Sequence, residues 1–70
     1  MNQFAKKRND AGYSQMAVSK ILRVDRSAVS KWETGVAKPL PGKLVKLAKL
    51  YGCTIEDLLT DAEADDQEAV

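Results

Sequence analysis

The sequence predicts a small all-α domain of five short helices, and two features of its pattern indicate this. Apolar residues recur three and four positions apart, whereas no window alternates between apolar and polar residues as a half-buried strand would. Residues that begin and end helices (serine, threonine, aspartate, glycine and proline) separate the apolar stretches. Because the chain has 70 residues, we expect one compact domain with a small core.

The first helix is expected over residues 2–11. Asn2 can cap its amino terminus, and Gly12 ends it because glycine readily adopts the left-handed conformation that follows a helix. The second helix follows a cap at Ser14 and continues to about Leu22. Its buried stripe is Val18 with either Ile21 or Leu22.

The third helix follows a cap at Asp25, continues to about Thr34 and stops at Gly35. Residues 36–40 form a loop. Pro41 then suits the first turn of the fourth helix, where its missing N–H costs nothing.

The fourth helix ends at Gly52, and Thr54 caps a short fifth helix over residues 55–59. Residues 60–70 have almost no apolar periodicity, so we expect a disordered acidic tail after a folded domain over residues 1–59. The apolar stripe of the fourth helix consists of Leu44, Leu47, Ala48 and Tyr51.

Charge is distributed unevenly along the chain. Residues 1–59 hold all 11 Lys and Arg residues and five of the ten acidic residues, a net charge of +6, whereas residues 60–70 hold the other five acidic residues and no base. A basic body with an acidic tail favours a polyanion as partner. For the tail, two interpretations stay open: a solubilising extension, or a segment that screens the basic body.

The residue inventory argues against an enzyme and against a metal site. The chain has no histidine, which is the commonest general base and metal ligand, and its single cysteine, Cys53, forms no internal disulfide or metal cluster. The sequence has no phosphate-cradling glycine loop, no apolar run typical of a signal peptide and none long enough to span a membrane. We therefore expect a cytoplasmic protein that needs no cofactor and no metal.

Only residues 23–25 separate the second helix from the third. Such a short turn makes the second helix of a pair cross the first steeply. Apolar residues of both helices and the turn then pack together: Val18, Leu22, Val24, Val29 and Trp32.

The outward side of the third helix carries short or cationic side chains at positions i, i+1, i+4 and i+5. A helix fits the major groove of DNA, and both arginine and lysine can donate to O6 and N7 of guanine. The expected base-reading stripe is Arg26, Ser27, Ser30 and Lys31, with Arg26 and Lys31 as the guanine readers.

At these residues the chain resembles the Cro/repressor-type helix-turn-helix family, the lambda-repressor-like or XRE domains. The matching stretch is YSQMAVSKILRVDRSAVSKWETG, followed by KP and then by LVKLAKLYGCTIEDLL, and the resemblance covers residues 3–59. It implies a five-helix domain with its helix-turn-helix at the second and third helices. It also implies a homodimer that binds a near-palindromic operator in double-stranded DNA, as a Cro-like phage or bacterial repressor does.

The resemblance further implies roles for single residues. Ser14, Gln15, Thr34 and Lys38 match positions that contact the DNA backbone, and Lys43, near the start of the fourth helix, is expected over a phosphate as well. In this family the fifth helix often forms the dimer contact, for which Ile55 and Leu58 are the candidates. The alternative is that both complete the core of the monomer. A place in the core is favoured for Leu58 and for the neighbouring Leu59. For Ile55 both interpretations stay open.

One buried ion pair is expected between the first and third helices. Phe4, Arg8 and Ala11 share a stripe at i, i+4 and i+7, and an arginine on a buried stripe needs a partner. Glu33 lies one turn after Val29 on the inward side of the third helix, and the family has an ion pair at the matching positions. We expect an Arg8–Glu33 pair with a structural role.

The sequence departs from the family in the turn of the helix-turn-helix. Arg23 occupies a position that the family usually fills with glycine, and a positive φ there costs another residue about 1 kcal/mol or more. The turn is therefore either strained or reshaped. Ser19 replaces the usual alanine at the helix crossing, where its hydroxyl can bond back to a carbonyl.

Two other functions of the same fold stay open. An antitoxin or a controller of a restriction–modification operon would also bind DNA but would act with a second protein, and a co-purifying partner would distinguish it. A protein-interaction domain that has lost DNA binding is disfavoured by Arg26 and Lys31, since a degenerate recognition helix would tend to lose its cations.

Overall fold

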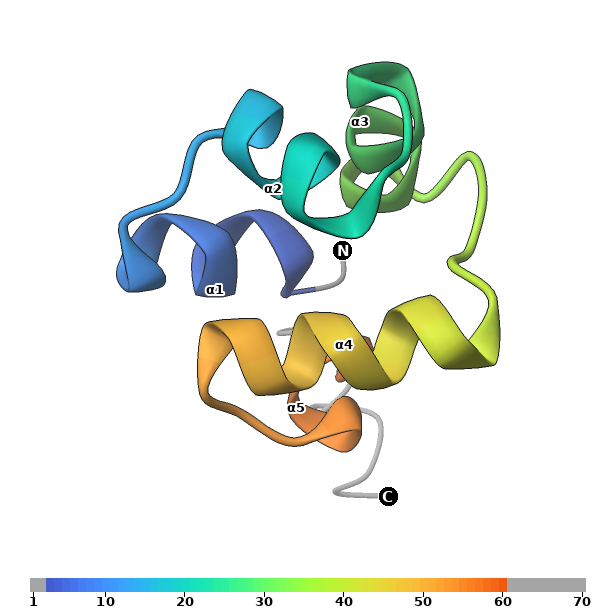
Figure 1. Ribbon diagram of the computed structural model, residues 1–70. Helices are drawn as coiled ribbons and strands as arrows, with labels where there is room; N and C mark the ends of the chain where they lie inside the picture. The colour runs from blue at the N-terminus through green and yellow to red at the C-terminus, as the bar shows by residue number, and fades with distance from the viewer. Residues whose placement is uncertain (1–2, 61–70) are drawn as a thin grey trace.

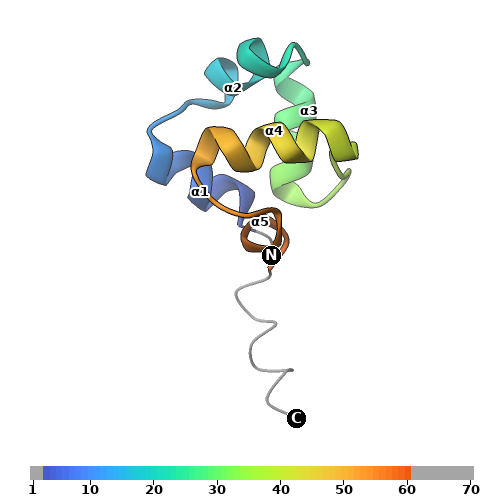
Figure 2. The same ribbon diagram turned by 60° about the horizontal axis from the view of Figure 1, so that its bottom comes forward.

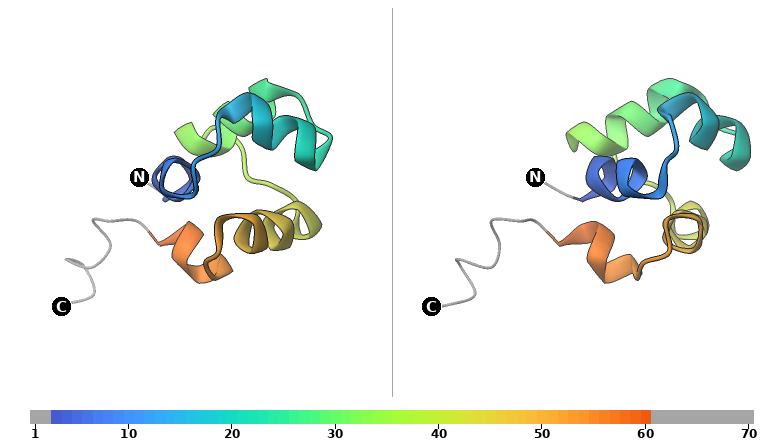
Figure 3. Two further views of the ribbon diagram at one scale, coloured as in Figure 1. Left: turned by 60° about the vertical axis from the view of Figure 1, so that its left-hand side comes forward. Right: turned by 90° about the vertical axis from the view of Figure 1, so that its left-hand side faces the viewer.

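The computed structural model describes residues 3–60. This part of the chain is all helical and contains no strand, so the expected five-helix all-α fold is confirmed. Figure 1 shows α1, α2 and α3 in the upper part of the molecule and α4 and α5 below them, and both views in Figure 3 show the same two layers. The helices are α1 (Phe4–Ala11), α2 (Gln15–Leu22), α3 (Arg26–Thr34), α4 (Pro41–Tyr51) and α5 (Ile55–Leu59).

Most helix ends lie where the capping residues predict them. The Ala17 N–H donates to Ser14 Oγ at 3.0 Å, which caps α2. Thr54 and Asp57 form a reciprocal capping box at α5, and the hydrogen bond from the Thr54 backbone N–H lowers the pKa of the Asp57 carboxyl. Left-handed glycines follow the three helices that were expected to stop there: Gly12, Gly35 and Gly52.

Two helix starts differ from the expectation. α1 begins at Phe4 with Gln3 as its N-cap, two residues later than predicted, and the expected cap Asn2 lies outside the described residues. Asp25 is the N-cap of α3, but its side chain makes no capping hydrogen bond. Neither start has a side-chain cap, so the buried Phe4 and Val29 must hold these helices by packing. The predicted tail over residues 60–70 lies outside the described residues from position 61 on.

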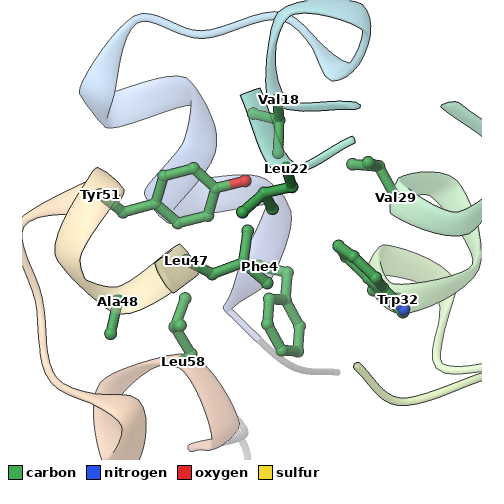
Figure 4. Close-up of a cluster of buried hydrophobic side chains, with 9 residues drawn as sticks. All are labelled: Phe4, Val18, Leu22, Val29, Trp32, Leu47, Ala48, Tyr51 and Leu58. Carbon is green, nitrogen blue, oxygen red and sulfur yellow. The ribbon is translucent and has the colours of Figure 1, made fainter. Parts of the chain in front are cut away.

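One apolar cluster fills the space between the helices, and Figure 4 shows its side chains pointing toward one another. The stripe of α2 ends in Leu22, which is 2% exposed, whereas Ile21 is 51% exposed. Ser19 is also buried, and its hydroxyl donates to the Met16 carbonyl at 2.7 Å as expected. All five helices contribute to the cluster: Phe4, Val18, Leu22, Val29, Trp32, Leu47, Ala48, Tyr51 and Leu58.

The fifth helix decides between the two interpretations of Leu58, as a dimer contact or as a core residue. Leu58 is 0% exposed, so it completes the core of the monomer and cannot reach a second copy. The placement of Leu59 in the core was wrong, because Leu59 is 48% exposed. Adjacent residues of a helix point about 100° apart, so the core receives only one of these two leucines. Ile55 is partly buried and packs against the core.

The buried Tyr51 should make the protein sensitive to alkaline pH. Burial, assisted by the negative charge of Glu33, raises the pKa of Tyr51 from 10.0 to about 12. The unfolded chain therefore loses this proton first, and stability falls as the pH rises from about 10 to about 12. Across this range, we expect the free energy of unfolding to fall by about 2 kcal/mol more in the wild type than in Tyr51→Phe. Urea unfolding at a series of pH values measures this, and parallel curves for the two proteins would contradict it.

Candidate nucleic-acid interface

α2 and α3 form the most closely packed pair among the described helices. Arg23, the residue that follows α2, has a φ of 59° and a ψ of 49°, and its N–H donates to the Lys20 carbonyl at 3.3 Å. The turn is therefore strained and not reshaped, since Arg23 adopts the left-handed conformation that glycine would adopt more easily. The two helices keep the short connection that the sequence predicts.

The outward stripe of α3 is open to solvent. Arg26, Ser27 and Lys31 are exposed and Ser30 is partly exposed, whereas the opposite side of the helix is buried. Figure 2 shows α2 and the start of α3 at the end of the molecule opposite α5. The structure therefore presents the predicted base-reading residues together, on a helix whose other face is part of the core.

A chain of hydrogen bonds connects the core to this stripe. Arg8 Nε donates to Glu33 Oε2 at 2.6 Å and Arg8 Nη2 donates to Glu33 Oε1 at 3.3 Å, so the expected ion pair is present. Gln15 Nε2 donates to the same Glu33 Oε1 at 2.8 Å. Arg26 Nη1 in turn donates to Gln15 Oε1 at 3.3 Å. Gln15 thus joins the ion pair to the first residue of α3.

The resemblance implies that Gln15 steadies the third helix, but the sequence does not indicate Glu33 and Arg26 as its partners. Gln15 lies 18 residues from Glu33 and 11 residues from Arg26, so no helical spacing rule connects them. The one available signal was the position of Gln15 at the start of the second helix, beside the Ser14 cap.

The ion pair also ties together three segments of the fold. The side chains of Arg8 and Glu33 are 13% and 7% exposed, and Arg8 Nη1 also donates to the Tyr13 carbonyl at 2.9 Å. The hydrogen bond to Glu33 raises the pKa of the Arg8 guanidinium above its usual value. The pair therefore holds α1, α3 and the connection before α2 in a fixed arrangement.

The residues expected at the DNA backbone lie around the same two helices. Ser14 and Thr34 are exposed at the start of α2 and at the end of α3, and Lys38 is exposed in the loop that follows. The Thr34 hydroxyl donates to the Lys31 carbonyl at 3.3 Å. Gln15 is partly buried and makes two hydrogen bonds with other side chains.

Lys43 differs from the expectation. Its Nζ donates to the Leu22 carbonyl at 2.9 Å, and the residue is partly buried. The ammonium group therefore faces the carboxyl end of α2 and does not extend into solvent toward a phosphate. Lys46 and Lys49 of the same helix are exposed.

A helix-turn-helix family model matches residues 4–58 of the chain. The chain belongs to this helix-turn-helix family. The match confirms the resemblance to the lambda-repressor-like or XRE domains and makes this helix-turn-helix protein a DNA-binding regulator. Comparisons with curated proteins and with solved structures found no match.

Within residues 3–60, no helix has the length and apolar character needed to cross a membrane. No group of three or more His, Cys, Asp or Glu side chains in the same residues could hold a metal ion.

Proposed function

We propose that this protein is a sequence-specific transcriptional repressor of the Cro-like kind, acting in the cytoplasm of a bacterium or of a phage-infected host. The observation that carries the proposal is the exposed stripe of α3, which holds two cations and two small hydroxyl residues on a helix packed firmly against the core. A helix presented in this way fits the major groove of a DNA operator.

In this proposal Arg26 and Lys31 donate to guanine, and Ser27 and Ser30 contact a base or a phosphate. The hydrogen bond to Gln15 limits the conformations of Arg26 before DNA arrives, which lowers the entropy lost on binding. Backbone contacts fix the register of the protein on DNA, and four residues are proposed for them: Ser14, Gln15, Thr34 and Lys38.

The proposed form on DNA is a homodimer. One recognition helix reads few base pairs, whereas two helices related by a two-fold axis read half-sites about 34 Å apart. Ile55 remains a proposed dimer contact, since it is partly exposed at the start of α5. The exposed Leu59 lies one turn further along the helix on the same side and replaces Leu58 in the proposed contact.

Selection from a pool of random DNA duplexes at two salt concentrations tests this function. We expect enrichment of a palindrome with guanines in each half-site and an affinity that falls steeply with salt. Arg26→Ala or Lys31→Ala should then cost about 1–3 kcal/mol at particular base pairs. Lys49→Ala is the matched control, because it removes an exposed lysine that lies on α4 and not on the stripe. If no sequence is enriched and salt has little effect, α3 does not read DNA.

An antitoxin or a restriction–modification controller would also pass this selection. Either would differ in acting with a second protein, so purification of the chain from its native cells distinguishes the roles. A stoichiometric protein partner would favour them over a self-sufficient repressor.

A further inference from the structure

Lys43 makes a contact that the proposed function does not use. It is the third residue of α4, yet its Nζ donates to the carbonyl of Leu22, the last residue of α2, at 2.9 Å. The left view in Figure 3 shows the end of α2 and the start of α4 on the same side of the molecule. The side chain thus bridges the two layers next to the turn of the helix-turn-helix.

The charge of Lys43 suits α2 and not its own helix. The amino end of a helix is the positive end of its dipole, so a lysine in the first turn of α4 is unfavourable there. The carboxyl end of α2 carries partial negative charge, and its last carbonyls have no partner within the helix. The ammonium of Lys43 supplies one of those carbonyls with a charge-assisted hydrogen bond.

The carbonyl that Lys43 holds belongs to the peptide group between Leu22 and Arg23. Arg23 has a left-handed backbone without being glycine, which brings its Cβ close to a carbonyl oxygen and strains the turn. Fixing the Leu22 carbonyl limits the rotation of this peptide group. Because α3 begins three residues after Arg23, the conformation of the turn sets the direction of the recognition helix.

We propose that Lys43 is a positioning residue for DNA recognition, which holds the turn between α2 and α3 in place of the glycine that the turn lacks. The part of this proposal that concerns DNA binding rests on the proposed function. The effect of the contact on the stability of the fold does not, because it can be measured without DNA. It also assigns Lys43 a role other than that of a phosphate ligand.

The first test compares Lys43→Met with Lys46→Met in the full chain, using the selected operator and a random-sequence duplex as probes. Methionine keeps most of the stem and removes the ammonium, and Lys46 is an exposed lysine on the same helix. For Lys43→Met we expect operator affinity to fall about tenfold, with binding to the random duplex little changed. The slope of log affinity against log salt should match that of Lys46→Met. A slope smaller by about 0.9 in Lys43→Met alone, with the operator-to-random ratio unchanged, would make Lys43 a phosphate ligand and overturn the proposal.

The second test is a double-mutant cycle with Arg23→Gly. Glycine adopts the left-handed conformation without help, so the loss caused by Lys43→Met should be smaller when position 23 is glycine. The cycle is measured both in operator binding and in urea unfolding of the four proteins. Equal losses in both backgrounds would show that Lys43 does not act through the turn.

The unfolding measurement separates this inference from the proposed function. If the wild type selects no operator, the proposed function fails, but coupling between positions 23 and 43 in unfolding would still show that Lys43 holds the turn. If the wild type selects an operator and no coupling is found in either measurement, the proposed function stands and the role of Lys43 is wrong.

Discussion

Replacing Glu33 with glutamine should destabilise the protein by about 3–5 kcal/mol, a large part of the stability of a domain of this size. The substitution leaves the Arg8 guanidinium buried beside a neutral amide, and the lost charge attraction is not replaced by water at so enclosed a site. Gln15 also loses a charged acceptor. The loss is measured as the change in the free energy of unfolding in urea.

Asp10→Asn is the matched control for this change. Asp10 accepts a 3.1 Å hydrogen bond from Lys6, and the two side chains are 58% and 66% exposed. An exposed pair of this kind contributes little, so the control should cost less than about 1 kcal/mol although the chemical change is the same. If Glu33→Gln and Asp10→Asn lower the free energy of unfolding equally, the buried pair contributes no more to stability than the exposed one.

The second large effect is expected at Leu58. Leu58→Ala removes three carbon atoms from a side chain with no exposed area and leaves a cavity, which should cost about 2–5 kcal/mol. Leu59→Ala is the control, because the neighbouring leucine is about half exposed and should cost less than about 1 kcal/mol. Thermal unfolding distinguishes them, since 1 kcal/mol shifts the midpoint by about 4–8 °C in a domain of this size.

These two leucines also separate folding from assembly. Leu59→Ala should leave the fold intact and weaken operator binding if α5 forms the proposed dimer contact. A larger loss of stability for Leu59→Ala than for Leu58→Ala would contradict the placement of Leu58 in the core.

The helix boundaries were largely predictable because capping acts over a few residues. Ser14 and Thr54 accept hydrogen bonds from N–H groups three residues further on, and left-handed glycines end three of the helices. Asp25 is an exception: it is the N-cap residue of α3, as its residue type predicts, but its side chain makes no capping hydrogen bond. Residue type shows which side chains can cap a helix, whereas the packing of the helix decides whether the capping hydrogen bond forms.

The contacts that join separate helices were less predictable. The Arg8–Glu33 pair could be expected because both residues lie on buried stripes and the family has a matching pair. The Lys43–Leu22 contact spans 21 residues and joins a flexible side chain to a backbone carbonyl, so no pattern of residue types indicates it. The placement of Leu59 in the core failed for another reason, since a helix of five residues is too short to show a period.

The division of α3 into a buried face and an outward stripe affects how this protein could evolve a new target. Ser27 and Lys31 are exposed, so in the proposed repressor mutations there change the preferred operator while the scaffold is conserved. Position 26 is less free, because its side chain must also suit Gln15 and, through it, the buried pair. Divergence of binding specificity among descendants of this chain should therefore begin at positions 27 and 31 and reach position 26 only together with position 15.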